Sequence, residues 1–205
     1  MALRFDRLVA TRKTGAELFH RDGRPVGFDL LGFWQWSTSD LVTNATRGIL
    51  AEFLVAQAVG AGASHVREEW AAFDLETASG IRVEVKSAAY LQAWAHAKPS
   101  TICFSIRPTR AWSPNTNQME EEPSRHADVY VFALLAHKDK ATIDPLNIAQ
   151  WHFYVLPRAV LDARARSQHS ITLKSLQALV GESLSFEELP EAIELAAVRN
   201  RELGG

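Results

Sequence analysis

Two oppositely charged side chains stand two positions apart in one short segment, at Glu84 and Lys86. They belong to the run Ile81–Lys86, in which apolar and charged residues alternate strictly. This alternation predicts a β-strand, because successive side chains of a strand point to opposite faces. The carboxylate and the ammonium group are therefore expected on one face, next to each other. A lysine in that position can orient a water molecule or stabilise negative charge that develops on a phosphate.

A second carboxylate, that of Asp74, lies in the apolar-rich segment Trp70–Leu75, which also reads as a strand. The residues Thr77–Gly80 between the two segments have the composition of a turn. If the two strands pair, Asp74 approaches Glu84. Two carboxylates that converge on one point form a site suited to a hard cation such as Mg²⁺ or Mn²⁺.

A segment with the pattern of an amphipathic helix precedes both predicted strands. The run Ala45–Val59 contains no proline, Thr43 or Asn44 can cap its start, and Gly60 can end it. Apolar residues recur along it at helical spacing, at Ile49, Leu50, Phe53, Leu54 and Ala56. The first turn, with Arg47 and the polar run 37–40 before it, could contact a phosphate, although plain capping explains these residues equally well.

This predicted helix carries a third carboxylate, Glu52, on its apolar stripe. Its neighbours at helical spacing are Gly48, Ile49, Val55 and Ala56. A buried carboxylate is costly unless it is paired or bound to a metal ion. Two interpretations follow: Glu52 pairs with an arginine such as Arg47 or Arg82, or it is a third acidic group directed at the centre that Asp74 and Glu84 form.

The charged strand also has a simpler interpretation. Alternating charges on a strand often form a solvated sheet face with cross-strand ion pairs. In that case the hairpin is only a surface, and Glu52, Asp74 and Glu84 do not come within bridging distance of one metal ion.

The order of these residues resembles the PD-(D/E)XK nuclease superfamily. Its pattern is a helix with an acidic residue, a strand with Asp, and a strand with Asp or Glu followed two positions later by Lys. Glu52, Asp74 and the triplet Glu84-Val85-Lys86 match that order. The resemblance covers about residues 44–106 in detail and implies a restriction-endonuclease-like core.

The resemblance also implies a role for each residue. Asp74 and Glu84 would bind Mg²⁺ or Mn²⁺, with the carbonyl of Val85 as a further ligand. Lys86 would position the attacking water and stabilise the pentavalent phosphate. Glu52 would bind a second metal ion or organise the water around the first. The implied reaction is hydrolysis of a phosphodiester bond, with DNA as the expected substrate.

Further elements complete the expected fold. Residues 87–94 read as the start of a helix, and two later segments, 171–180 and 187–203, also have helical character. Three further segments read as strands, namely Thr101–Ile106, Val129–Leu135 and Trp151–Leu156. Cys103, in the first of them, is expected to be a buried, inert thiol. This order predicts a single α/β domain over residues 1–205, an α+β arrangement with a mixed sheet flanked by helices.

One long segment, 107–127, contains three prolines, the acidic triplet Glu120–Glu122 and no apolar periodicity. Long segments of this kind are functional or disordered more often than not. We expect it to form a mobile loop.

Composition narrows the function classes. The chain has 205 residues and a formal net charge of −2, which argues against a strongly basic protein that coats nucleic acid but permits an enzyme with local positive charge. Its single cysteine excludes an intramolecular disulfide and a cysteine-rich zinc site. Residues 1–13 lack the apolar stretch of a signal peptide, and the longest apolar run, 129–136, is far shorter than a membrane span. We therefore expect a cytoplasmic protein without a membrane partner.

The leading hypothesis is a Mg²⁺-dependent nuclease that acts on DNA in defence, restriction or repair. Cleavage of both strands would need two sites, which favours a homodimer or a partner protein. The alternative is a non-catalytic module on the same fold that binds nucleic acid or protein. The sequence favours the enzyme, because all four expected polar positions are filled.

Overall fold

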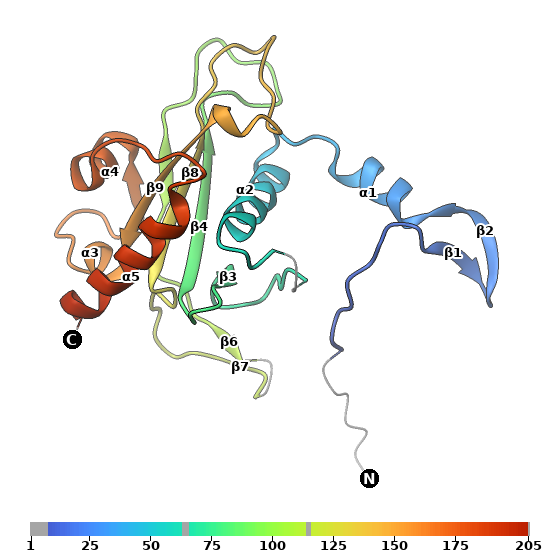
Figure 1. Ribbon diagram of the computed structural model, residues 1–205, viewed down its shortest axis with the longest axis horizontal. Helices are drawn as coiled ribbons and strands as arrows, with labels where there is room; N and C mark the ends of the chain where they lie inside the picture. The colour runs from blue at the N-terminus through green and yellow to red at the C-terminus, as the bar shows by residue number, and fades with distance from the viewer. Residues whose placement is uncertain (1–7, 63–65, 114–115, 205) are drawn as a thin grey trace.

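The computed structural model describes residues 8–62, 66–113 and 116–204. Its centre is a four-stranded sheet with the order β3-β4-β8-β9 (Figure 1). The strands are β3 (Leu75–Glu76), β4 (Arg82–Ala89), β8 (Val129–Leu135) and β9 (Trp151–Pro157). β4 pairs with β8 in parallel, whereas β3 with β4 and β8 with β9 are antiparallel. The sheet is therefore mixed, as the sequence predicts.

Strand β8 is central, and every one of its residues is buried. Its sequence, VYVFALL, is continuously apolar rather than alternating, because both of its faces are covered. One face packs against α2 (Asn44–Ala58) and α5 (Leu189–Gly204), with Val83, Val85 and Leu54 among the shared core residues. The sequence predicts both helices to within two residues.

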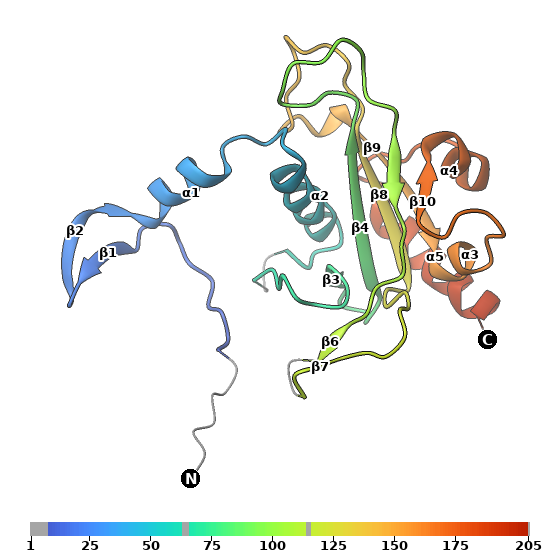
Figure 2. The ribbon, with the colours of Figure 1, turned by 180° about the vertical axis from the view of Figure 1, so that it is seen from behind.

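The other face of the sheet is covered by a smaller layer (Figure 2). This layer contains β5 (Cys103–Ser105) paired with β10 (Ser170–Thr172), together with α3 (Arg158–Asp162) and α4 (Leu173–Val180). Phe104, Phe132 and Leu176 are buried where this layer meets the sheet. The expected helix over 171–180 is correct only from Leu173 onward, because Ser170–Thr172 pairs with β5.

Two expectations about the segments on either side of the predicted strand Ile81–Lys86 are wrong. The segment Trp70–Leu75 is a strand only at its last residue, since β3 spans Leu75–Glu76. The segment after Lys86 is not helical: β4 continues to Ala89 because its parallel pairing with β8 continues to Leu135. Long-range pairing thus outweighs the helical propensity of the alanines there.

The long segment 107–127 is not without secondary structure. It contains the short antiparallel hairpin of β6 (Trp112–Ser113) and β7 (Gln118–Met119), and Thr109 bridges to Ser124. Residues 114 and 115 lie outside the described residues. A short 3₁₀ helix, η1 (Ile148–Gln150), precedes β9.

The N-terminal part of the described chain forms an arm of β1 (Leu18–Arg21), β2 (Arg24–Asp29) and α1 (Leu30–Thr38). Figures 1 and 2 both show this arm beside the body rather than packed on the sheet. No residue of α1 is buried, and Trp36 is 85% exposed. Sequence reasoning assigned no element to this region, and residues 1–7 of the segment examined for a signal peptide lie outside the description. No described helix is long and apolar enough to cross a membrane.

Candidate active site

Helix α2 places Glu52 against the segment that follows the helix. Its carboxylate forms an ion pair with Arg67, whose guanidinium donates to both carboxylate oxygens. The hydrogen bond with Glu52 is the main cause of a raised pKa for Arg67. The predicted partners were wrong: Arg47 bonds elsewhere, and Arg82 pairs with Asp128 at 2.7 Å. Glu52 is therefore paired, but by an arginine that no sequence pattern identified.

Asp74 lies at the edge of the sheet, immediately before β3. Its backbone N–H donates to the carbonyl of Val83 at 3.1 Å, which extends the pairing of β3 with β4 by one bond. Its side-chain Oδ2 accepts a 2.6 Å hydrogen bond from the backbone N–H of Val85. The Asp74 carboxylate thus accepts the main-chain hydrogen bond that a backbone carbonyl would accept if the edge strand were longer.

Burial and neighbouring charges raise the pKa of Asp74 to about 7. Burial is the largest cause, followed by repulsion from Glu84, while the hydrogen bond from Val85 acts in the opposite direction. Glu52 adds a smaller repulsion and Lys86 a smaller attraction. All four predicted side chains therefore act electrostatically on this one edge of the sheet.

Glu84 and Lys86 lie on the same face of β4, as the alternation predicts. The Lys86 ammonium forms an ion pair with Glu84, and their side chains are 30% and 19% exposed. Tyr130 of β8 is the register partner of Glu84. Its pKa is raised, first by burial and then by the negative charge of Glu84. The Glu84–Lys86 ion pair thus has the buried Tyr130 on its inner side and the edge of the sheet on its outer side.

The two glutamates approach Asp74 from different faces of the sheet. Helix α2, which carries Glu52, packs on the face that contains Val83 and Val85. Glu84 alternates with these valines and so points to the opposite face. Among the described residues, no three His, Cys, Asp or Glu side chains form a group that could hold a metal ion. Each glutamate thus repels the charge of Asp74, but the three carboxylates do not form one group among the described residues.

The backbone of Val85 faces the same edge as Asp74. In a strand the N–H and C=O of one residue point to one side, and the next residue reverses. The carbonyls of Val83 and Arg82 accept from Asp74 and Asp128 respectively, so odd-numbered residues of β4 face the edge. The carbonyl of Val85 therefore points towards the edge at which the Asp74 carboxylate is held.

The donor set fits a Mg²⁺ ion. Magnesium is commonly bound by one or two carboxylates, with water and substrate phosphate oxygens completing its shell. Asp74 and Glu84 repel each other at a partly buried edge, and a divalent cation between them would remove that repulsion. The absence of a three-residue group among the described residues is compatible with this mode, because it needs only two carboxylates.

The sequence patterns did not identify one basic residue of this region, Arg67. Arg67 has no periodic context, and the signal for its role lies only in the tertiary contact with Glu52. Arg47 was considered as a core arginine and is indeed buried, at 4% exposure, but its side chain bonds to Ser87, Val42 and Asn44 instead of Glu52. Cys103 was expected to be buried and is exposed, because β5 is short and its odd-numbered residues face away from the core.

The comparisons with known proteins agree with a nuclease. No curated protein matches the chain. The family model of bacteriophage T4 endonuclease IV matches residues 34–175, which is more than half of the chain and includes Glu52, Asp74, Glu84 and Lys86. The match extends from α1 into α4 and leaves out β1, β2 and α5. On this match, the chain belongs to the bacteriophage T4 endonuclease IV family.

Proposed function

We propose that the protein is a Mg²⁺-dependent endonuclease that hydrolyses phosphodiester bonds in DNA, with a PD-(D/E)XK-type site at the edge of β4. The observation that carries this proposal is the pair Asp74 and Glu84, which repel each other beside the ammonium group of Lys86. Membership of an endonuclease family supports the reaction class. Manganese could replace magnesium, because the ligands are hard oxygen donors.

The first role is to hold the metal ion. Asp74, Glu84 and the carbonyl of Val85 would hold the metal ion, which when bound supplies Lewis-acid activation of the phosphate. Asp74 is prepared for this role because the backbone N–H of Val85 fixes its Oδ2. This hydrogen bond involves only Oδ2, so the other carboxylate oxygen of Asp74, Oδ1, is available for a ligand.

Lys86 is the group for the water and the developing charge. Its ammonium group has three N–H donors, and the ion pair with Glu84 fixes its position at the edge. Lys86 would orient water for attack on phosphorus and stabilise the negative charge on the phosphoryl oxygens. Attack by water forms the new P–O bond as the bond to the leaving sugar oxygen breaks. The attacking water releases one proton to the solvent, and the departing oxygen takes up one proton from the solvent.

Glu52 would have a supporting role. It lies on the other face from Glu84, with both oxygens in contact with Arg67. It would act on the water around the metal ion, or bind a second ion after Arg67 moves away.

Cleavage assays test the proposal. Supercoiled plasmid, single-stranded DNA and RNA are incubated with Mg²⁺ or Mn²⁺, with wild type beside Glu84→Gln and Lys86→Ala. We expect metal-dependent cleavage of DNA by wild type and a loss of at least about 100-fold in each variant. Glu76→Gln, at an exposed carboxylate of β3, is the matched control and should keep its activity. Metal-dependent cleavage that persists in Glu84→Gln would refute the assigned site, and DNA binding without any cleavage would favour a non-catalytic binding module.

A further inference from the structure

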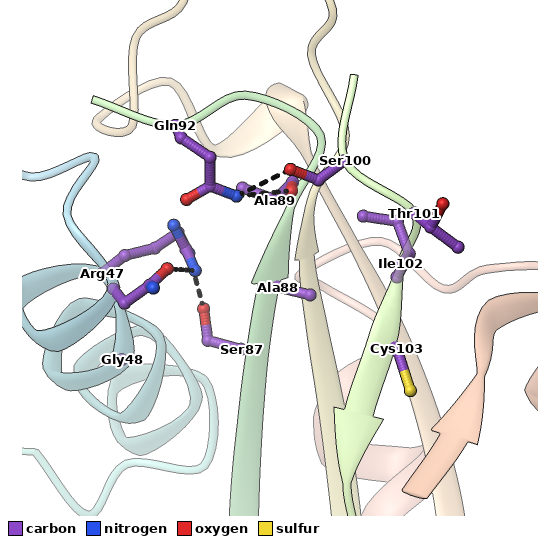
Figure 3. A pocket seen from close by; sticks show the side chains of 11 residues that line it. Arg47, Gly48, Ser87, Ala88, Ala89, Gln92, Ser100, Thr101, Ile102 and Cys103 are labelled. Carbon is purple, nitrogen blue, oxygen red and sulfur yellow. Dashed lines mark hydrogen bonds between the residues drawn. The ribbon is translucent and has the colours of Figure 1, made fainter. Parts of the chain in front are cut away.

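A pocket lies where the start of α2 meets the end of β4 (Figure 3). It has a volume of about 340 Å³ and is lined by residues of α2, of the last part of β4 and of the segment 92–103. Ser87, which lines the pocket, directly follows Lys86 along β4. Its side chain points to the face on which α2 packs, opposite to the side chains of Glu84 and Lys86. The pocket lining contains one charged side chain, Arg47, and no carboxylate.

Arg47 is a buried cation without an acidic partner among the described residues. It is only 4% exposed, and burial lowers its pKa. Its guanidinium donates to Ser87 Oγ at 3.1 Å, to the Val42 carbonyl at 2.8 Å and to Asn44 Oδ1 at 2.7 Å. All three acceptors are neutral. A guanidinium has five N–H donors, so two have no acceptor in the described part of the chain.

Burial of a charge is unfavourable unless a counter-charge compensates it. The neutral acceptors fix the guanidinium in place but leave its charge unbalanced. An anionic ligand would supply both the missing charge and the missing acceptors.

The start of α2 adds to the positive potential. The helix has 15 residues, and its first turn contains no acidic residue. The N-cap residue, Thr43, makes no side-chain capping bond. The N–H groups of the first turn therefore lack the usual side-chain acceptor, and the helix dipole favours an anion at this end.

Gln92 adds a second constraint on the ligand, because its side chain offers a hydrogen-bond acceptor that needs a donor. Its side-chain nitrogen donates to the Ala89 carbonyl at 3.3 Å and to Ser100 Oγ at 3.1 Å. This fixes the amide orientation, because a flipped amide would place two carbonyl oxygens together. Its Oε1 is buried and has no hydrogen-bond partner in the described structure. Figure 3 shows this oxygen turned to the Arg47 side of the pocket.

We propose that this pocket binds one nucleotide of the DNA strand, with its phosphate on Arg47 and a donor group of the same nucleotide on Gln92 Oε1. A bare phosphate would satisfy the cation but not the orphaned acceptor, whereas a nucleotide carries both groups. The inference rests on the proposed function, because it takes the strand at the neighbouring site to be DNA. The phosphate is either internal to the strand or at its end.

Gly48 gives a test that leaves Arg47 and its three hydrogen bonds intact. It lines the pocket, and a Cβ at this position would meet nothing within 4 Å. Gly48→Asp therefore adds a negative charge to the pocket without steric conflict, and Gly48→Asn is the matched neutral control. Thermal unfolding of both variants checks that they are folded.

Binding is measured without cleavage, in EDTA, by fluorescence anisotropy of a short labelled single-stranded oligonucleotide. Gly48→Asp should weaken binding by about tenfold or more, because like charges placed together oppose association. Gly48→Asn should lose less affinity than Gly48→Asp, because it adds a side chain of the same size without the charge. Competition by deoxynucleoside monophosphates should exceed competition by inorganic phosphate for wild type. Equal affinities for Gly48→Asp and Gly48→Asn would overturn the inference.

Oligonucleotides with and without a 5′-phosphate distinguish the two sources of the phosphate. Tighter binding of the phosphorylated strand supports a terminal phosphate in the pocket, and equal binding supports an internal one. The cleavage assay separates this inference from the proposed function. If wild type cleaves DNA but the two Gly48 variants bind alike, only the pocket is refuted. If the variants differ as expected but no metal ion supports cleavage, the pocket remains and the nuclease proposal fails.

Discussion

The side chain of Asp74 accepts a 2.6 Å hydrogen bond from the backbone of Val85, the residue between Glu84 and Lys86. This bond joins the edge of the sheet to the strand that carries the other two charged groups. The carboxylate of Asp74 is therefore fixed by the main chain, which few side-chain substitutions can disturb. Burial and the negative charge of Glu84, in contrast, disfavour the ionised form of Asp74.

The metal-free protein should lose stability as the pH rises towards neutral because of Asp74. Its pKa is about 7 in the folded protein, above the ordinary value of 3.8. Between these values the folded state binds more protons than the unfolded state, so the free energy of unfolding falls with rising pH. The slope from one proton is at most about 1.4 kcal/mol per pH unit. Asp74→Asn should flatten this dependence in urea unfolding between pH 4 and pH 7, and an unchanged slope would contradict the raised pKa.

Added Mg²⁺ should stabilise wild type through the proposed site. A ligand that binds only the folded state raises the unfolding free energy by about 2.7 kcal/mol at 100 times its Kd. We expect a concentration-dependent rise in Tm for wild type and for Glu76→Gln. Glu84→Gln should show no rise, since one of the two carboxylate ligands is lost. An equal rise in all three proteins would place the metal ion elsewhere.

The ion pair of Glu52 with Arg67 should contribute little to stability. The Arg67 side chain is 39% exposed, and such pairs are typically worth about 0–1 kcal/mol. A double-mutant cycle of Glu52→Ala and Arg67→Ala, followed by urea unfolding, measures the coupling directly. A coupling energy above about 2 kcal/mol would show that the pair is a major structural element.

Leu135 should be a strong determinant of stability. It is fully buried at the end of β8. Leu135→Ala should lower the free energy of unfolding by about 2–5 kcal/mol, because it removes buried methyl groups and leaves a cavity. Leu146→Ala, at a residue that is 68% exposed, should change it by less than about 0.5 kcal/mol. Similar losses in both variants would contradict the assigned core.

Two glycines, one inside α2 and one just after it, should respond to replacement by alanine in opposite directions. Gly60 follows the helix with a φ of 72°, a conformation that alanine rarely adopts, so Gly60→Ala should destabilise by about 1 kcal/mol. Gly48 lies inside the helix with open space at its Cβ position, so Gly48→Ala should stabilise by about 0.5–1 kcal/mol. Thermal unfolding of the two single variants measures both signs.

The parts of the fold with a single dominant pattern were predictable. Helix α2 follows from apolar periodicity, strands β8 and β9 follow from short apolar-rich runs, and Val129–Leu135 is predicted to the residue. The end of β4 was not predictable, because its last alanines become a strand only through pairing with β8. The position of Asp74 follows from its spacing, but the hydrogen bond to Val85 needs the folded edge. The partner of Glu52 depends on the path of the chain after α2, which periodicity does not describe.

The parallel pairing of β4 with β8 has a consequence for how the protein folds. Arg82 and Asp128, which meet at the start of this pair, are 46 positions apart in the chain. Closing so large a loop costs entropy before any contact across it can form, and non-local pairing of this kind slows folding. β3 and the segment with Asp74 can join β4 locally, but β4 lacks its second neighbour until β8 arrives. We therefore expect local pairing to bring Asp74 close to Glu84 early in folding. The site should become ordered only in the final, slow stage, when β8 pairs with β4.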